Sequence, residues 1–346
     1  MTYDLAILGL GIAGLAVSFR IKNKTIVILG KTDDTASRCA TGVTTHKGLI
    51  TARGELFQLK ERGHKNLPKW IDEVSQSTHQ KISIHYGVEE HFLSEQDGKE
   101  IQQRIYRDCA LENFAVKKIK EGFLYPEDYV FDVNQLLNSL LFHANAAHTV
   151  IHSHACKILR KADFYTIITD DAQPIQAKSI LIACGKDAQA VTKSFGLGDL
   201  DVNFLAGKTF YGHLTTEKGS QFSQKALTHR GRNISALNEI FRIGSTASNE
   251  ALEEDLADFE ALRRHFGCSL SPSGNWLGVR TRFRDRLPKI LLLERLSSTQ
   301  KIYFLGGYYK SGFQFADLMA QEFIALFDGN NQRAFSSNSG CVRDAI

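Results

Sequence analysis

The sequence lacks the cysteine spacing of a metal site or of a disulfide framework. Its six cysteines, at positions 39, 109, 156, 184, 268 and 341, form no Cys-x-x-Cys pair and follow no regular interval. The histidines, among them His152 and His154, are not accompanied by other potential ligands at the spacing of a metal site. These absences argue against a zinc site and against a fold held together by disulfides. We therefore expect a cytoplasmic chain with reduced cysteines and no metal centre.

Long hydrophobic runs are also missing. No stretch approaches the roughly 18 uninterrupted apolar residues of a membrane span, so we expect a soluble protein. The apolar segment Leu5–Val17 is not preceded by basic residues, which argues against a secretion signal. The chain contains no internal repeat and no low-complexity tract.

The composition is that of an ordinary globular protein. With 346 residues, 43% hydrophobic and 23% charged, the chain is long enough for two domains or for one large α/β domain with a second one inserted. A net charge of +4 permits an anionic substrate or RNA without requiring either.

The first thirty residues contain a glycine motif between two predicted strands. The apolar run Tyr3–Leu8 predicts a buried strand, Ile12–Ile21 has helical spacing, and Thr25–Leu29 predicts a second strand. A G-x-G-x-x-G turn after a strand and before a helix is the arrangement in which helix N–H groups bind a pyrophosphate. The pattern therefore predicts a dinucleotide site. The motif residues expected to form it are Gly9, Gly11, Ile12, Ala13 and Gly14.

One position departs from this pattern. The second strand of such a unit usually ends in an acidic residue that binds the adenosine ribose. Gly30 stands there, followed by Lys31 and Thr32, while Asp33 and Asp34 lie in the next loop. The ribose could be held by these aspartates reaching back, or by Thr32 and the main chain.

The rest of the chain predicts a mixture of helices and strands. We expect surface helices over residues 53–76, broken near Gly63 and Pro68, and a helix over Phe131–Ala147 with Asp132 as its N-cap. Antiparallel strands are expected over residues 203–245 and a helix over Glu250–Phe266. The run Ser179–Ile182 predicts a buried strand, which ends in Ala183, Cys184 and Gly185. The last expected elements are the strand Ile302–Leu305, a glycine loop at 306–312 and the helix Phe315–Phe327.

These elements indicate an α/β fold. We expect a Rossmann-type nucleotide-binding domain, discontinuous in sequence, with an inserted α+β substrate domain built on a mainly antiparallel sheet. The expected boundaries are 1–80, 126–190 and 271–330 for the first domain, 81–125 and 191–270 for the second, and 331–346 for a flexible tail.

Four motifs in a fixed order resemble the FAD-dependent D-amino-acid oxidase superfamily, especially its glycine-oxidase and sarcosine-oxidase branch. They are the opening glycine turn, the loop from Ala36 to Gly42, the turn Ile182–Gly185, and the loop Gly307–Gly312 before a helix. The stretch Gly278–Pro288 is similar to the oxidase half of the bifunctional enzymes that make 5-methylaminomethyl-2-thiouridine in tRNA. That half removes a carboxymethyl group from a modified wobble uridine. Tyr308-Tyr309-Lys310, in contrast, is closer to the oxidases of free amino acids.

The resemblance implies non-covalent FAD, because no cysteine stands where sarcosine oxidases attach flavin. Besides the five motif residues, it implies cofactor contacts at Lys31, Ser37, Gly42, Val43, Ala183, Gly185, Gly307, Ser311, Gly312 and Phe313. It also implies that Arg280 pairs with the substrate carboxylate and that Lys310 supplies a second cation near the flavin. Read from the residues alone, Arg280 could instead belong to a solvated face with Arg282, Arg284 and Arg286, and Lys310 could be a surface-loop residue.

The implied activity is oxidation of an N–CH2–COO⁻ unit by hydride transfer to flavin. Two substrates contain that unit, a small amino acid such as glycine or sarcosine, and a carboxymethylaminomethyl uridine in tRNA. A third alternative is a protein that binds FAD without turnover.

Overall fold

The structure is a computed structural model. It describes residues 1–32, 35–45, 52, 54–91, 95–96, 98–103, 115–120, 122–171, 173–214, 225–229, 232–237, 240–244, 270–329 and 342–344.

The first of two sheets is built around parallel strands. Its described strands follow the order β18-β16-β17-β10-β1-β2-β7, with β9 beside β10 and β8 beside β9. Strands β17, β10, β1, β2 and β7 run parallel, whereas β16 and β9 are antiparallel to their neighbours β17 and β10. The bounds are β1 Thr2–Leu8, β2 Ile26–Leu29, β7 Thr149–Ile151, β8 Ala155–Arg160, β9 Tyr165–Thr169, β10 Pro174–Ile182, β16 Lys289–Arg295, β17 Lys301–Gly306 and β18 Val342–Asp344.

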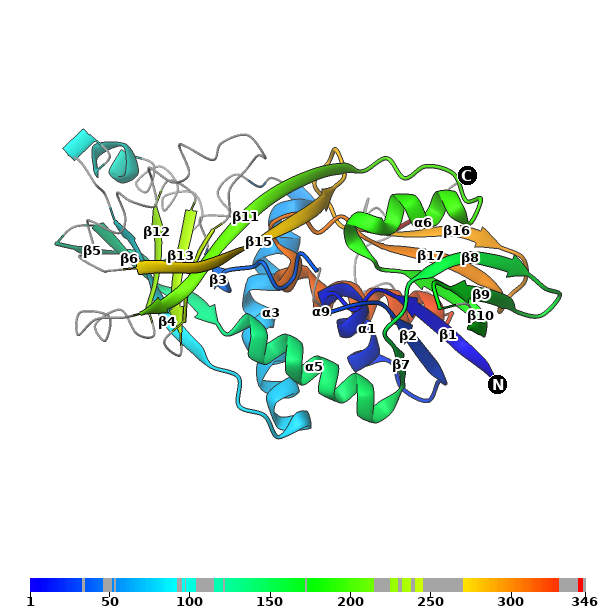
Figure 1. The fold of residues 1–346 in the computed structure, drawn as a ribbon. Helices are drawn as coiled ribbons and strands as arrows, with labels where there is room; N and C mark the ends of the chain where they lie inside the picture. Colours follow the sequence, from blue (N-terminus) through cyan, green and yellow to red (C-terminus); the bar gives the residue numbers. More distant parts are fainter. Residues whose placement is uncertain are drawn as a thin grey trace.

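Both faces of this sheet are covered, which explains why its strands are apolar throughout. Successive side chains of a strand point to opposite faces, so Leu5 and Ile7 of β1 join one core and Ala6 and Leu8 join another. Helices α1, α3, α5 and α9 supply the first core, and β8, β9 and α6 supply the second. Figure 1 shows α3 and α5 lying between the two sheets. The helix bounds are α1 Ile12–Arg20, α3 Gly54–Thr78, α5 Val133–Ala147, η1 Gly185–Asp187, α6 Ala188–Ser194 and α9 Gly312–Phe327.

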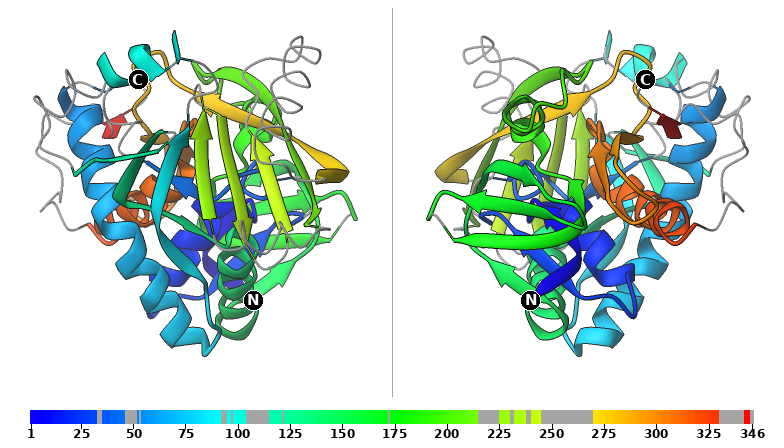
Figure 2. Two further views of the ribbon diagram at one scale, coloured as in Figure 1. Left: turned by 90° about the vertical axis from the view of Figure 1, so that its left-hand side faces the viewer. Right: turned by 90° about the vertical axis from the view of Figure 1, so that its right-hand side faces the viewer.

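The second sheet is mainly antiparallel and is seen face-on in the left view of Figure 2. Its order is β15-β11-β14-β13-β12-β4-β6-β3, with β5 beside β6 and one parallel pair, β12 with β4. The longest strands, β11 and β15, form an antiparallel ribbon that reaches from this sheet toward the first (Figure 1). The bounds are β3 Val43–Thr44, β4 Ile84–His91, β5 Lys117–Ile119, β6 Gly122–Phe131, β11 Asn203–Leu214, β12 Lys225–His229, β13 Arg232–Leu237, β14 Ile240–Gly244 and β15 Leu270–Arg282.

The predicted α/β fold, with a parallel nucleotide-binding layer and a mainly antiparallel second layer, is confirmed. Most of β6 and β15 fall in segments that the predicted boundaries at 126 and 271 assign to the nucleotide-binding domain, yet both strands belong to the second sheet. The division into domains stays a prediction. Within the predicted flexible tail, Val342–Asp344 forms β18 beside β16. The helix expected over Glu250–Phe266 lies outside the described residues.

The predicted break near Gly63 and Pro68 is wrong, because α3 is continuous from Gly54 to Thr78 and contains both residues. A Cβ atom on Gly63 would lie 2.4 Å from the carbonyl oxygen of Gln314, so this glycine allows α3 to approach α9 closely. Five large apolar side chains of α3 are almost fully buried. Burying each stabilises the helix by about 1.5–3 kcal/mol, which together outweighs the roughly 3 kcal/mol cost of an internal proline. The five are Leu59, Leu67, Trp70, Ile71 and Val74.

The predicted N-cap of α5 is confirmed. A carboxylate oxygen of Asp132 accepts hydrogen bonds from the backbone N–H groups of Asn134, at 2.9 Å, and Gln135, at 3.0 Å. These bonds satisfy two of the donors that every helix leaves unpaired at its first turn.

The carboxylate of Asp4 ties together three segments at one end of the parallel strands. It accepts hydrogen bonds from the backbone N–H of Thr25 and from Lys178, at 3.0 and 2.9 Å. These bonds, the backbone one first, lower the pKa of Asp4 to about 2. A carboxyl whose pKa is lower in the folded than in the unfolded chain stabilises the fold above the unfolded pKa of about 4, and this contribution is lost as the pH falls through 2.

Replacing Asp4 with asparagine is therefore expected to lower the free energy of unfolding at pH 7, and the deficit should shrink between pH 4 and pH 2. Urea unfolding of both proteins across this range measures the difference. Asp163→Asn, at an exposed position, is the control. A deficit independent of pH would show that the charge of Asp4 does not stabilise the fold.

Candidate active site

A large cavity lies where the parallel strands end and the second sheet begins. Its volume is about 820 Å³. Its walls come from the residues after β1, β2 and β10, the loop from Thr35 to Thr44, strand β15 and the loop from Gly306 to Gly312. The carboxyl ends of parallel strands are where α/β sheets bind their ligands.

The glycine turn after β1 forms one wall. The backbone N–H of Gly9 donates to the carbonyl of Leu29 at 2.7 Å, which holds the turn against β2. Gly14 does not line the cavity. A Cβ atom on it would lie 2.1 Å from the carbonyl oxygen of Gly9, so Gly14 allows α1 to pack against the end of β1.

The absence of an acid at position 30 has a conformational explanation. Gly30 has a φ of 154°, and a Cβ atom there would lie 3.0 Å from the backbone nitrogen of Leu10. Both features favour glycine, so the backbone geometry itself disfavours the usual aspartate or glutamate. Lys31 lines the cavity, and its Nζ lies 3.7 Å from a carboxylate oxygen of Asp170, which follows β9. Asp33 and Asp34 lie outside the described residues.

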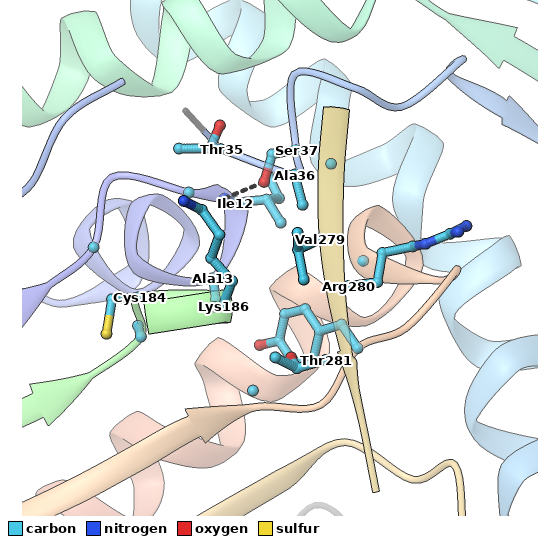
Figure 3. Close-up of a pocket in the computed structure, with 18 of the residues that line it drawn as sticks. Ile12, Ala13, Thr35, Ala36, Ser37, Cys184, Lys186, Val279, Arg280 and Thr281 are labelled. Carbon is cyan, nitrogen blue, oxygen red and sulfur yellow. Dashed lines mark hydrogen bonds between the residues drawn. The ribbon is translucent and has the colours of Figure 1, made fainter. Parts of the chain in front are cut away.

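Ser37 connects the second loop to the glycine turn. Its Oγ accepts a hydrogen bond of 3.0 Å from the backbone N–H of Ile12, the first residue of α1 (Figure 3). The sequence singled out Ser37 through its loop motif, and the structure places it at the helix N-terminus.

Three buried donors of the second sheet fix the same loop, and the sequence analysis did not identify them. Thr209 of β11 donates to the carbonyl of Cys39 at 2.5 Å, and Ser235 of β13 donates to that of Thr41 at 2.6 Å. Arg242 of β14 donates to the carbonyl of Ala40 at 2.8 Å. The second sheet thus determines where the cavity loop lies.

Replacing Ser235 with alanine is expected to lower the free energy of unfolding by about 1–3 kcal/mol, because the buried carbonyl of Thr41 loses its partner. The cofactor affinity should fall as well, since the loop that lines the cavity is released. Ser77→Ala, on the exposed surface of α3, is the matched control. Chemical unfolding and cofactor titration of the apoprotein give the two quantities. Unchanged values for Ser235→Ala would mean that the loop is held without this hydrogen bond.

Two predicted catalytic residues reach the cavity from different elements. Arg280 lies on β15 opposite Leu205 of β11, is partly buried, and donates from Nη2 to the carbonyl of Ala206 at 3.3 Å. Burial lowers the pKa of its guanidinium, which nevertheless stays charged in proteins. Figure 3 shows Arg280 directed to the opposite side of β15 from Val279, as strand alternation requires. Lys310 is exposed at the cavity wall, and its Nζ lies 5.7 Å from the ring centre of Tyr309.

Two further residues of the turn after β10 face the cavity, Cys184 and Lys186. Burial raises the pKa of the Cys184 thiol to about 12. This thiol is therefore neutral near pH 7 and is not an activated nucleophile. Lys186 was missed by the sequence analysis, because one lysine after a strand resembles any surface lysine. Its Nζ lies 3.8 Å from a carboxylate oxygen of Asp187, and both residues line the cavity.

Two glycines of the cavity wall indicate that a ligand lies against the backbone. A Cβ atom on Gly11 would meet nothing nearer than the Ser37 Oγ at 3.4 Å, and one on Gly312 nothing nearer than Ile12 at 3.7 Å. Neither has a positive φ. Nothing described in the chain excludes a side chain at these two positions, whereas a bulky ligand in close contact with the main chain would.

All the predicted cofactor residues except Gly14 line this one cavity. They converge from the beginning, middle and end of the chain, and Arg280 and Lys310 line the same cavity. That these residues contact the cofactor and the substrate stays a prediction.

A parallel sheet with a glycine turn at its strand ends, facing a second, mainly antiparallel sheet across one cavity, is an arrangement typical of dinucleotide-binding proteins. Within this class, the sequence matches the FAD dependent oxidoreductase (DAO) family over residues 4–326, and the chain belongs to that family. It is an FAD-dependent oxidoreductase, as the sequence predicted, and FAD is its cofactor.

Solved structures of the same fold cover nearly the whole chain. The structure of glycine oxidase from Geobacillus kaustophilus matches with a TM-score of 0.79 and 18% identity over 96% of each chain. Iminodiacetate oxidase from Chelativorans sp. BNC1 matches with a TM-score of 0.74 and 15% identity over 98% of this chain and 99% of the other. L-alpha-glycerophosphate oxidase from Mycoplasma pneumoniae, solved with FAD bound, matches with a TM-score of 0.71 and 15% identity over 100% of this chain and 99% of the other. No curated protein matches the sequence.

The cavity fits FAD. The open backbone of Gly11 and Gly312 and the N-terminus of α1 are suited to a large anionic dinucleotide. None of the described helices is both long and apolar enough to cross a membrane.

Proposed function

We propose that this oxidoreductase acts on an amine that carries an N-carboxymethyl, glycine-like unit. The observation that carries the proposal is the position of Arg280, a partly buried arginine that shares one cavity with the glycine turn. A planar guanidinium offers two parallel donors that match a carboxylate, so Arg280 is suited to bind the substrate in one orientation. Lys310 adds a second positive charge at the same wall.

In this reaction the protein mainly orients the substrate and excludes water. When bound, FAD supplies the acceptor for a hydride. Arg280 holds the carboxylate so that the methylene carbon has a fixed position. The C–H bond of that carbon breaks with both electrons leaving as hydride, and the nitrogen loses a proton to solvent. The resulting imine reacts with water to give the free amine and glyoxylate.

The experiment uses the FAD-loaded enzyme without oxygen and records the visible spectrum as small amines are added. Glycine, sarcosine or iminodiacetate is expected to bleach the flavin absorbance and to yield glyoxylate. A yellow protein that none of these amines bleaches would contradict a small amine substrate.

A carboxymethylaminomethyl uridine in tRNA is the second candidate. It is favoured by Arg284 and Arg286, which are exposed in the turn after β15. Contacts to phosphates release counterions, so binding of such a tRNA should weaken steeply as salt rises, whereas turnover of a small amine should change little. Measuring the turnover of each substrate between 50 and 200 mM salt, roughly the range over which phosphate contacts lose most affinity, separates the two candidates.

A further inference from the structure

Tyr309 is the centre of a cluster of positive charges beside the cavity. The Cζ atom of Arg280 lies 5.8 Å from the centre of the Tyr309 ring, that of Arg282 lies 5.3 Å away, and the Nζ of Lys310 lies 5.7 Å away. Each distance is within the roughly 6 Å at which a cation is attracted to an aromatic ring. Three cations from two segments therefore meet at one ring.

The backbone holds this arrangement in place. The N–H of Tyr309 donates to the carbonyl of Thr281 at 3.0 Å, which links the loop to β15 between Arg280 and Arg282. Tyr309 has a φ of 50°, uncommon for a residue other than glycine. Backbone strain of this kind is found where the surrounding structure fixes a functional side chain.

Two more cations, on α3 and in the β15–β16 turn, interact electrostatically with this cluster. Burial and, less strongly, repulsion by Arg286 and Lys310 together lower the pKa of the Lys60 ammonium to about 8. Lys60 of α3 thus lies within electrostatic range of Arg286 and Lys310. Of these five positive side chains, Arg280 and Lys310 line the cavity.

One carboxylate does not account for this cluster. It has two oxygens, and the fork of Arg280 alone can bind both. The Nε atom of Arg282 is shielded from solvent and donates to no residue that the structure describes. A shielded donor without a partner destabilises the protein unless a ligand accepts its hydrogen bond.

We propose that Arg282 forms a second anion-binding subsite beside the carboxylate site of Arg280 and Lys310, so that the amine substrate carries a second anionic group. This inference rests on the proposed function, because it takes the first carboxylate to lie at Arg280. The second group is a carboxylate or a phosphate, since both accept hydrogen bonds from arginine and lysine. The subsite thus narrows the substrate class from monoanionic to dianionic amines.

The test measures binding of unreactive ligands, so that it does not depend on turnover. Methoxyacetate and diglycolate have an ether oxygen in place of the amine and differ by one carboxylate. Phosphonomethoxyacetate carries a phosphonate as its second anion. Each is titrated into the FAD-loaded enzyme at low salt, and the dissociation constant is read from the change in the flavin spectrum.

In the unaltered protein, diglycolate or phosphonomethoxyacetate should bind on the order of tenfold tighter than methoxyacetate. The tighter of the two identifies the second group. Arg282→Met should reduce this preference to about onefold while methoxyacetate affinity stays within about twofold, because Arg280 is retained. Lys69→Met, which removes an exposed charge elsewhere on α3, should leave the preference unchanged.

Equal binding of the monoanion and both dianions by the unaltered protein would overturn the subsite. So would an undiminished preference in Arg282→Met and in Arg282→Gln; the second variant keeps a polar side chain on β15 and serves if the first does not fold. A different result would contradict the proposed function, namely a flavin that no amine bleaches, whether or not these ligands bind.

Discussion

Replacing Gly14 with valine is expected to give a protein that is isolated without flavin colour. A Cβ atom at this position would lie 2.1 Å from the carbonyl oxygen of Gly9 and 3.1 Å from Ile7, so α1 would have to move away from the end of β1. Overpacking of this kind costs about 3 kcal/mol or more. The same displacement would open the glycine turn, and with it the cavity wall.

Gly11→Ala is the matched comparison, because its Cβ atom would meet only the Ser37 Oγ at 3.4 Å. This variant should unfold at nearly the same urea concentration as the unaltered protein and yet bind FAD more weakly, since the new methyl group points at the ligand. Unfolding curves and the absorbance ratio of flavin to protein test both variants. A Gly14→Val protein that keeps its colour and stability would contradict the packing role of Gly14.

The second large effect is expected at Arg280. Arg280→Met keeps much of the apolar stem and removes the fork that would bind the substrate carboxylate. We expect kcat/KM for the best amine substrate to fall by about 100-fold or more, as for other partly desolvated charge pairs that lose one partner. Arg280→Lys should recover only part of this loss, because an ammonium group keeps the charge but lacks the planar pair of donors.

Arg284→Met is the control for Arg280, since Arg284 lies four residues further along and is exposed. It should leave kcat/KM for a small amine unchanged. The flavin content of each variant has to be measured alongside, so that lost cofactor is not mistaken for lost substrate binding. An Arg280→Met enzyme of undiminished efficiency would remove Arg280 from the site.

Short sequence patterns predicted the glycine turn, the elements on either side of it and the cap of α5. Gly9, Gly11 and Gly14 occur between two apolar runs, and this spacing alone indicates a strand, a turn and a helix. The cap of α5 was equally local, because Asp132 directly precedes the apolar stripe of the helix. Such features depend on backbone geometry within a few residues and can therefore be read without knowing the fold.

The features that were missed depend on contacts between distant segments. Thr209, Ser235 and Arg242 hold carbonyl groups that lie 170 to 202 residues earlier in the chain, and no local pattern marks a polar strand residue as such a donor. Gly63 looked like a helix break for the same reason. Its role is apparent only once α9 lies against α3, with the carbonyl of Gln314 in the space that a side chain would fill.

Strands β11 and β15 fix the position of Arg280 relative to the loop at 35–44. Thr209 of β11 holds the cavity loop through Cys39, and Arg280 of β15 lies in the same ladder, where Thr209 pairs with Trp276 and Leu205 with Arg280. The distance between the loop at 35–44 and Arg280 is thus set by strand register. Substitutions along β15 change single contacts, whereas deletion of one residue between Trp276 and Arg280 would turn the arginine to the other face of the strand. This segment should therefore tolerate changes of side chain far better than changes of length.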